Sequence, residues 1–172
     1  MFLKLKPTYI TDHVTSINFE DLIQEGIKGL IFDLDNTIMK PRTGKLTEDI
    51  REWLNQAKEH FQLAVVSNNP HKDYMEEVEK EVGIPVYYRA KKPRRGATLK
   101  AIKDMKLLPS EVAMVGDRTL TDIFVGQRIG LVTILVDPLM KYQEPAFIRL
   151  CRKFERLFIH PAKKVFSKNN GS

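Results

Sequence analysis

Short, continuous runs of apolar residues alternate with amphipathic stretches along most of the chain, and this alternation restricts the fold more than any other feature. Because the apolar runs are not interrupted by polar residues at every second position, both faces of the predicted sheet must be covered, which is typical of parallel strands. We therefore expect an α/β fold with a Rossmann-like, doubly wound parallel sheet. The strands are predicted at 28–35, 62–69, 84–90, 111–117 and 130–137, and the helices at 46–60, from Pro70 onward, at 95–107 and at 119–129.

Positive charge is concentrated at the C-terminal end of the chain. The protein has 172 residues and a formal net charge of +6. Residues 141–172 contain eight Lys or Arg and two Glu, so this segment carries the whole excess. We expect a core at 1–140 followed by a basic amphipathic C-terminal helix and tail at 141–172, where an anionic partner would bind.

Cysteine content and hydropathy limit the class of protein. The one cysteine, Cys151, cannot form an intramolecular disulfide, and one Cys with four His gives no zinc-ligand spacing. No segment approaches the ~20 apolar residues that a transmembrane helix requires. Residues 1–10 also lack the apolar run of a signal peptide. These features predict a cytoplasmic protein.

Polar side chains follow several of the predicted strands at the point where each strand ends. Because the carboxyl ends of parallel strands meet at one edge of the sheet, we expect these side chains to lie together. Several carboxylates in one cleft repel each other unless a cation lies between them. Oxygen ligands without sulfur or imidazole indicate a hard ion, for which Mg²⁺ is the best candidate. The polar residues that follow the predicted strands are Asp33, Asp35, Ser67, Asn68, Lys92 and Asp117.

A lysine and a hydroxyl beside such a metal site suit a phosphoryl group, whose transfer depends on positioning and charge neutralisation. A carboxylate can also act as the nucleophile and form an acyl-phosphate. These residue types therefore indicate phosphomonoester chemistry.

Four motifs, in order, resemble those of the haloacid dehalogenase (HAD) superfamily of phosphatases. They are Asp-Leu-Asp-Asn-Thr at 33–37, Ser67 after an apolar strand, Lys92 before a proline, and Gly-Asp-Arg-Thr-Leu-Thr-Asp at 116–122. The resemblance covers roughly residues 27–137. It implies a HAD-like sheet and an Mg²⁺-dependent hydrolase that passes through an aspartyl-phosphate.

The resemblance also implies a role for each motif residue. Asp33 would be the nucleophile and Asp35 the general acid and base. Mg²⁺ would be bound by the Asp33 carboxylate, the Asp35 main-chain carbonyl and Asp117, with Asp122 supporting or ligating. The implied phosphate-binding residues are Ser67, Asn68, Lys92 and Thr37, the last of which orients the loop after Asp33.

The spacing of the motifs leaves no room for a cap domain. Asp35 and Ser67 are 32 positions apart, and Ser67 and Lys92 are 25 apart, so each interval is filled by one helix and one strand. A capless, open cleft suits a phosphate presented by something large, such as a lipid surface, a protein or a nucleic acid end. The cleft could also be closed by an oligomer partner, and the sequence leaves the oligomeric state open.

Two segments, 17–38 and 116–139, resemble one branch of the superfamily more closely. This branch is the YqeG-type class IIIA phosphatases, which are similar to the mitochondrial-type phosphatidylglycerophosphate phosphatase. The resemblance implies a phosphorylated lipid substrate, phosphatidylglycerophosphate, converted to phosphatidylglycerol in phospholipid biosynthesis. Arg94 and Arg95, next to Lys92, could then meet the phosphodiester of the headgroup.

The C-terminal segment predicts an amphipathic helix with two possible locations. A bulky apolar face and a basic polar face are typical of an interfacial helix on anionic lipid. The same pattern is typical of a final helix packed on the sheet. The lipid interpretation would place the protein peripherally on the inner face of a membrane. The apolar residues are Phe147, Leu150, Cys151, Phe154, Leu157 and Phe158, and the basic residues between them are Arg149, Arg152, Lys153 and Arg156.

Two other functions stay open. One is a soluble phosphatase that acts on a sugar phosphate, a nucleotide or a nucleic acid end, with the basic tail binding nucleic acid. The other is an RNA- or ribosome-associated binding protein with residual phosphatase activity. Nucleic acid is not the expected partner, because the aromatic residues of the tail lie on one helical face and are not scattered as stacking platforms.

Overall fold

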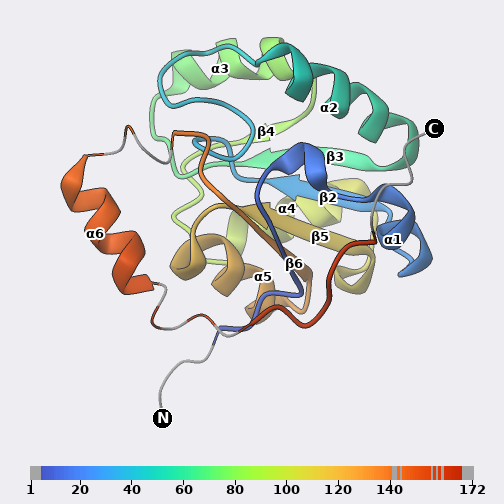
Figure 1. Cartoon of the computed structure of the whole chain (residues 1–172). Coiled ribbons are helices and arrows are strands. Elements are labelled where there is room, and N and C mark those ends of the chain that lie inside the picture. Colours follow the sequence, from blue (N-terminus) through green and yellow to red (C-terminus); the bar gives the residue numbers. More distant parts are fainter. Residues whose placement is uncertain are drawn as a thin grey trace.

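The structure, a computed structural model, describes residues 5–140, 143, 145–155, 157, 159 and 161–167. In these residues six parallel strands form one sheet in the order β1-β6-β5-β2-β3-β4 (Figure 1). The strands are β1 (Tyr9–Thr11), β2 (Gly29–Phe32), β3 (Gln62–Val66), β4 (Val86–Tyr87), β5 (Val112–Gly116) and β6 (Val132–Val136). The α-helices are α1 (Phe19–Gln24), α2 (Glu48–His60), α3 (Lys72–Val82), α4 (Gly96–Met105), α5 (Phe124–Ile129) and α6 (Ala146–Glu155).

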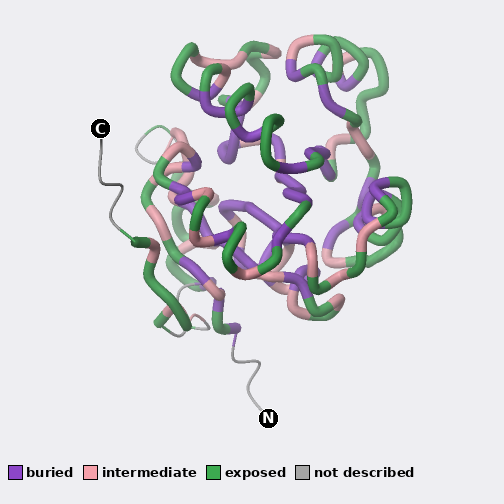
Figure 2. Tube along the Cα trace, turned by 90° about the vertical axis from the view of Figure 1, so that its right-hand side faces the viewer, coloured by how far each residue is buried: buried purple, intermediate pink, exposed green. Residues whose placement is uncertain are grey.

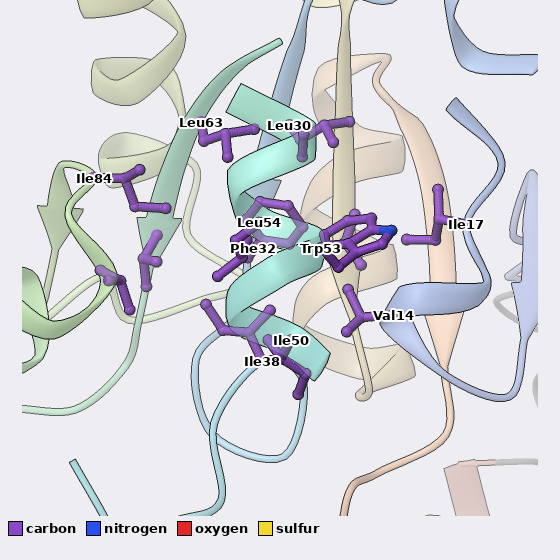
Figure 3. Packing of buried hydrophobic residues seen from close by; sticks show 14 of the residues in the cluster. Val14, Ile17, Leu30, Phe32, Ile38, Ile50, Trp53, Leu54, Leu63 and Ile84 are labelled. Carbon is purple, nitrogen blue, oxygen red and sulfur yellow. The ribbon is translucent and has the colours of Figure 1, made fainter. Parts of the chain in front are cut away.

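Successive strand residues point to opposite faces of the sheet, so the continuous apolar strands contribute side chains to two buried layers, one on each face. On β2, Leu30 and Phe32 belong to the layer beneath α1, α2 and α3, whereas Ile31 belongs to the layer beneath α4. Figure 3 shows Phe32 close to Trp53 and Leu54 of α2, and the Phe32 and Trp53 ring centroids are 5.9 Å apart. Figure 2 shows the buried trace concentrated between the outer helices. The predicted doubly wound parallel sheet is thus confirmed.

The strand and helix predictions are correct in kind but differ in extent. The strand predicted at 84–90 is only β4, because Arg89 and Lys91 adopt positive φ angles of 54° and 53° that end the extended backbone. The helix predicted at 119–129 is a π-helical turn, Thr119–Ile123, followed by α5. The sequence prediction missed β1, which is three residues long and pairs with β6 alone.

No inserted domain lies between the predicted motifs, as expected for a capless protein. Residues 36–61 supply a loop and α2, and residues 68–91 supply α3 and β4. The chain instead places α6 beside the carboxyl edge of the sheet (Figure 1). No helix in the described part of the chain is long and apolar enough to cross a membrane.

The segment that follows α6 returns to the core. Lys164 N donates to Thr8 O at 2.9 Å, and the rings of Phe166 and Tyr9 stack with centroids 4.0 Å apart. Ser167 N donates to Asp21 Oδ2 at 2.6 Å. Residues 161–167 therefore pack along β1 and α1, while Lys141, Arg156 and Phe158 of the predicted tail lie outside the described residues.

Candidate active site

The central strands bring the motif residues to one edge of the sheet. β2 lies between β5 and β3, with Phe32 opposite Val115 on one side and Val65 on the other. Asp33, directly after β2, continues this pairing by donating its N–H to Val115 O at 2.9 Å. Asp117 and Ser67 follow β5 and β3. The predicted convergence of strand ends is therefore present in the fold.

Lys92 forms the buried centre of this cluster. Its Nζ lies 2.7 Å from Asp33 Oδ1 and 2.8 Å from Asp122 Oδ1, and its side chain is 1% exposed. Burial alone would lower the pKa of Lys92, but the charges of Asp122 and Asp33 outweigh it and raise the pKa above its ordinary value. Lys92 is therefore a permanent cation that fixes one oxygen of Asp33.

Three carboxylates, from Asp33, Asp117 and Asp122, offer oxygen atoms within 4.8 Å of one another. Burial, followed by repulsion from the neighbouring carboxylates, raises the pKa of Asp117 to about 8. The same causes raise the pKa of Asp122 to about 6, although Lys92 opposes the rise. Gly116 allows this close approach, because a Cβ there would lie 2.4 Å from the Asp122 carboxyl group. A buried, mutually repelling set of oxygen ligands fits a divalent cation.

Asp35 lines the same cavity but has a different environment. Burial raises its pKa above the ordinary value, and the charges of Lys92 and Arg42 reduce the rise only in part. A raised pKa favours the protonated form of the carboxyl group, which is the form that a general acid requires.

The loops after β3 and β4 are tied together by side chains. Asn68 Oδ1 accepts a hydrogen bond from Lys92 N at 2.6 Å, and Asn68 Nδ2 donates to Lys92 O at 3.3 Å. Ser67 Oγ accepts from Asn69 N at 3.1 Å. Thr37 Oγ1 donates to Asp117 Oδ1 at 3.3 Å. Asn68 thus positions Lys92, and Thr37 positions Asp117.

These residues surround a cavity of about 470 Å³. Thr37 and Asp122 lie beneath it, each at most 1% exposed and bonded to a residue of its wall. Arg94 and Arg95 are exposed and do not line it. Of the predicted site residues, those in its wall are Asp33, Asp35, Ser67, Asn68, Lys92 and Asp117.

Three arginines that the sequence interpretation did not assign to the site also line this cavity: Arg42, Arg118 and Arg152. Arg152 comes from α6, and its guanidinium donates to Asp117 Oδ2 at 2.5 Å and to Asp117 O at 2.9 Å. No local sequence signal marks this residue, because its place depends on how α6 docks.

Glu155 is the second residue of α6, besides Arg152, that is hydrogen-bonded to residues at the site. Its Oε1 accepts from Arg118 at 2.9 Å and its Oε2 from Thr119 N at 3.2 Å. The polar face of α6 therefore contacts the site, and large apolar residues of the helix are exposed: Phe147 at 71%, Leu150 at 63% and Phe154 at 60%. The apolar stripe does not pack on the sheet in the way that a final core helix would.

Comparison with known proteins agrees with this geometry. The fold resembles that of a HAD phosphatase from Thermococcus onnurineus, with a TM-score of 0.55 and 14% identity over 70% of this chain and 90% of that one. A probable phosphatase, YqeG of Bacillus subtilis, is 32% identical over 92% of this chain and 91% of its own length. A chloroplastic/mitochondrial phosphatidylglycerophosphate phosphatase 1 of Arabidopsis thaliana is 36% identical over 81% of this chain, which spans 42% of that protein.

Sheet, motif order and relatives together define a phosphatase of the HAD type. Residues 3–140 match the family model described as mitochondrial PGP phosphatase, and the chain belongs to this family. The resemblance stated from the motifs is thereby confirmed.

The carboxylate cluster predicts an unusual pH dependence of stability. In the metal-free protein the pKa of Asp117 is raised from 3.8 to about 8, so the native state keeps a proton that the unfolded chain has lost. The free energy of unfolding should therefore fall as pH rises from 5 to 8, by on the order of 2–3 kcal/mol more in the wild type than in Asp117→Asn. Urea unfolding at both pH values in EDTA measures this difference.

Asp73→Asn on α3, which replaces an exposed carboxyl group outside the cavity, is the matched control and should keep the wild-type slope. Mg²⁺ should stabilise the wild type more at pH 8 than at pH 5. An Asp117→Asn protein with the same pH slope as the wild type would show that burial and the neighbouring carboxylates do not raise the pKa of Asp117.

Proposed function

We propose that this protein is an Mg²⁺-dependent phosphomonoester hydrolase that removes the terminal phosphate of phosphatidylglycerophosphate and releases phosphatidylglycerol. The observation that carries the proposal is the pairing of Lys92 with Asp33, at the end of β2, and with Asp122, beside a cavity that Asp33, Lys92 and Asp35 line. The lipid substrate is supported by the family match and by the name of the Arabidopsis relative.

Asp33 is the proposed nucleophile. Lys92 holds Oδ1 of Asp33, and Oδ2 of Asp33 attacks the phosphorus. The bond between phosphorus and the glycerol oxygen breaks, and Asp35 gives its proton to that oxygen. Asp35 then takes a proton from a water molecule that attacks the aspartyl-phosphate, which returns Asp33 and releases inorganic phosphate. The raised pKa of Asp35 suits a group that must first carry this proton.

The remaining groups bind charge. Asp33, Asp117 and the Asp35 carbonyl would hold Mg²⁺, with Asp122 as a supporting or direct ligand. The ion would neutralise negative charge on the phosphoryl oxygens. In this proposal Ser67, Asn68 and Lys92 bind the phosphate, and Thr37 contributes by holding Asp117.

The headgroup of the proposed substrate carries a second phosphate, the phosphodiester. Arg42, Arg118 and Arg152 line the cavity, and in this proposal they bind the phosphodiester. Arg94 and Arg95 would contact only a headgroup that extends beyond the cavity wall.

We also propose that α6 docks on an anionic membrane surface. Phe147 and Leu150 of α6 are 71% and 63% exposed, and Leu157, two residues beyond the end of the helix, is 76% exposed. Arg149 and Lys153 are also exposed on the helix. Apolar residues flanked by cations are what an interfacial helix requires. Because the other face of α6 is bonded to the site, docking would bring the cavity to the lipid headgroups. In this proposal the protein is cytoplasmic and binds peripherally to the inner face of the membrane.

Replacement of the two acids tests the chemistry. Asp33→Asn should reduce phosphate release from phosphatidylglycerophosphate in mixed micelles with Mg²⁺ to background, because no nucleophile remains. Asp35→Asn should reduce kcat by about 10²–10⁴-fold, the usual contribution of a general acid. Asp73→Asn is the control and should keep full activity. An Asp33→Asn enzyme that remains active would contradict the aspartyl-phosphate mechanism.

Vesicle co-sedimentation tests the membrane surface. Phe147→Asp combined with Leu157→Asp should weaken binding to phosphatidylglycerol-containing vesicles about tenfold or more, because two apolar contacts are lost and two repelling charges are added. Leu108→Asp, at a leucine of similar exposure (64%) before Pro109, should bind as the wild type does. Equal binding by all three proteins would contradict docking through α6.

A further inference from the structure

A second, apolar cavity lies against α6. It is a groove of about 680 Å³ between the π-helical turn Thr119–Ile123 and α6, and it is distinct from the acidic cavity. Leu120 contributes from the turn, and apolar side chains of α6 together with Leu157, two residues after its end, contribute from the other side. The groove is lined by Arg118, Leu120, Leu150, Cys151, Lys153, Phe154, Glu155 and Leu157.

Arg118 lines both the groove and the active-site cavity. Its side chain is 35% exposed, and one of its nitrogens donates to Glu155 Oε1 at 2.9 Å. Its Nε is buried and makes no hydrogen bond with the described residues. The guanidinium therefore lies at the junction of the two cavities and has donor capacity left after Glu155 is satisfied.

We propose that this groove binds the first part of an acyl chain of the phospholipid substrate, an inference that rests on the proposed function. The acidic cavity, Arg118 and the apolar groove follow one another along the protein surface in the same order as the terminal phosphate, the phosphodiester and the acyl chain of such a lipid. The acidic cavity takes the terminal phosphate, Arg118 meets the phosphodiester, and the apolar groove follows on the far side of Arg118. Each methylene that leaves water for the groove adds to affinity.

Charge at the rim favours an anionic lipid over an apolar segment of another protein. Two cations, Lys153 and Arg118, and one anion, Glu155, which pairs with Arg118, line the groove, so its lining carries a net positive charge. Leu150 and Leu157 belong both to the groove and to the surface proposed to meet the membrane. An acyl chain could therefore enter the groove from the bilayer without crossing water.

The groove can be tested apart from membrane docking with substrates that form no surface. Dioctanoyl phosphatidylglycerophosphate below its micellar concentration is compared with the deacylated molecule of the same headgroup. The wild type should hydrolyse the acylated molecule with a kcat/KM at least about tenfold higher, since several methylenes are buried. Leu150→Asp and Leu120→Ala should lose most of this preference and keep the wild-type rate on the deacylated molecule. Leu108→Asp is the matched control and should keep the preference.

Cys151 gives a second measurement that does not depend on turnover. It is the one cysteine of the chain, it is partly exposed, and it lines the groove. Monomeric dioctanoyl phosphatidylglycerol should slow its alkylation by a maleimide severalfold, and deacylated glycerophosphoglycerol should not. In Leu150→Asp the protection should be lost.

The outcomes distinguish failure of the acyl-chain groove from failure of the proposed phosphatase function. Hydrolysis of both molecules at equal kcat/KM, with no protection of Cys151, would overturn the groove and leave the phosphatase function in place. Hydrolysis of neither molecule would overturn the proposed lipid function and the groove with it. A dimer in solution that Leu150→Asp converts to a monomer would assign the groove to a second copy of the chain and overturn the acyl-chain proposal.

Discussion

The buried ion pairs of Lys92 with Asp33 and Asp122 are the interaction on which the rest of the structure depends. A lysine that is 1% exposed is tolerated only where carboxylates compensate for the water it has lost. The three partners come from distant segments: the end of β2, the loop after β4 and the π-helical turn after β5. Only a parallel sheet with β2 at its centre places these segments together. The same fold that buries the apolar strands therefore assembles the charge cluster.

The helix α6 extends this arrangement toward the substrate. An amphipathic helix usually turns its apolar face to the core, but here Arg152 and Glu155 face inward, bonded to Asp117 and Arg118, and the large apolar side chains are exposed. The described residues include no cap domain between the motifs, and α6 supplies one wall of the candidate active-site cavity and one side of the apolar groove. The inverted orientation is the physical basis for the proposals of membrane docking and acyl-chain binding.

Much of this architecture follows from local sequence. Uninterrupted apolar runs such as 28–35 predict buried parallel strands, and the polar residues after them predict which side chains meet at the sheet edge. What local patterns cannot predict depends on tertiary contacts. The strand β1 is three residues long, and β6 is the strand that pairs with it. Arg152 is one of several basic residues on α6. The way that α6 docks makes Arg152 contact Asp117 and leaves Arg149 and Lys153 exposed, and the local sequence does not show this difference.

We propose that this cluster cleaves a phosphomonoester presented by a lipid. The most direct measurement is the ratio of kcat/KM for phosphatidylglycerophosphate in mixed micelles to kcat/KM for soluble sugar phosphates and nucleotides, all with Mg²⁺. We expect a ratio of at least about 10², because only the lipid would occupy the cavity, contact the arginines and fill the apolar groove at the same time. A ratio near one, or faster cleavage of a soluble ester, would contradict the lipid assignment.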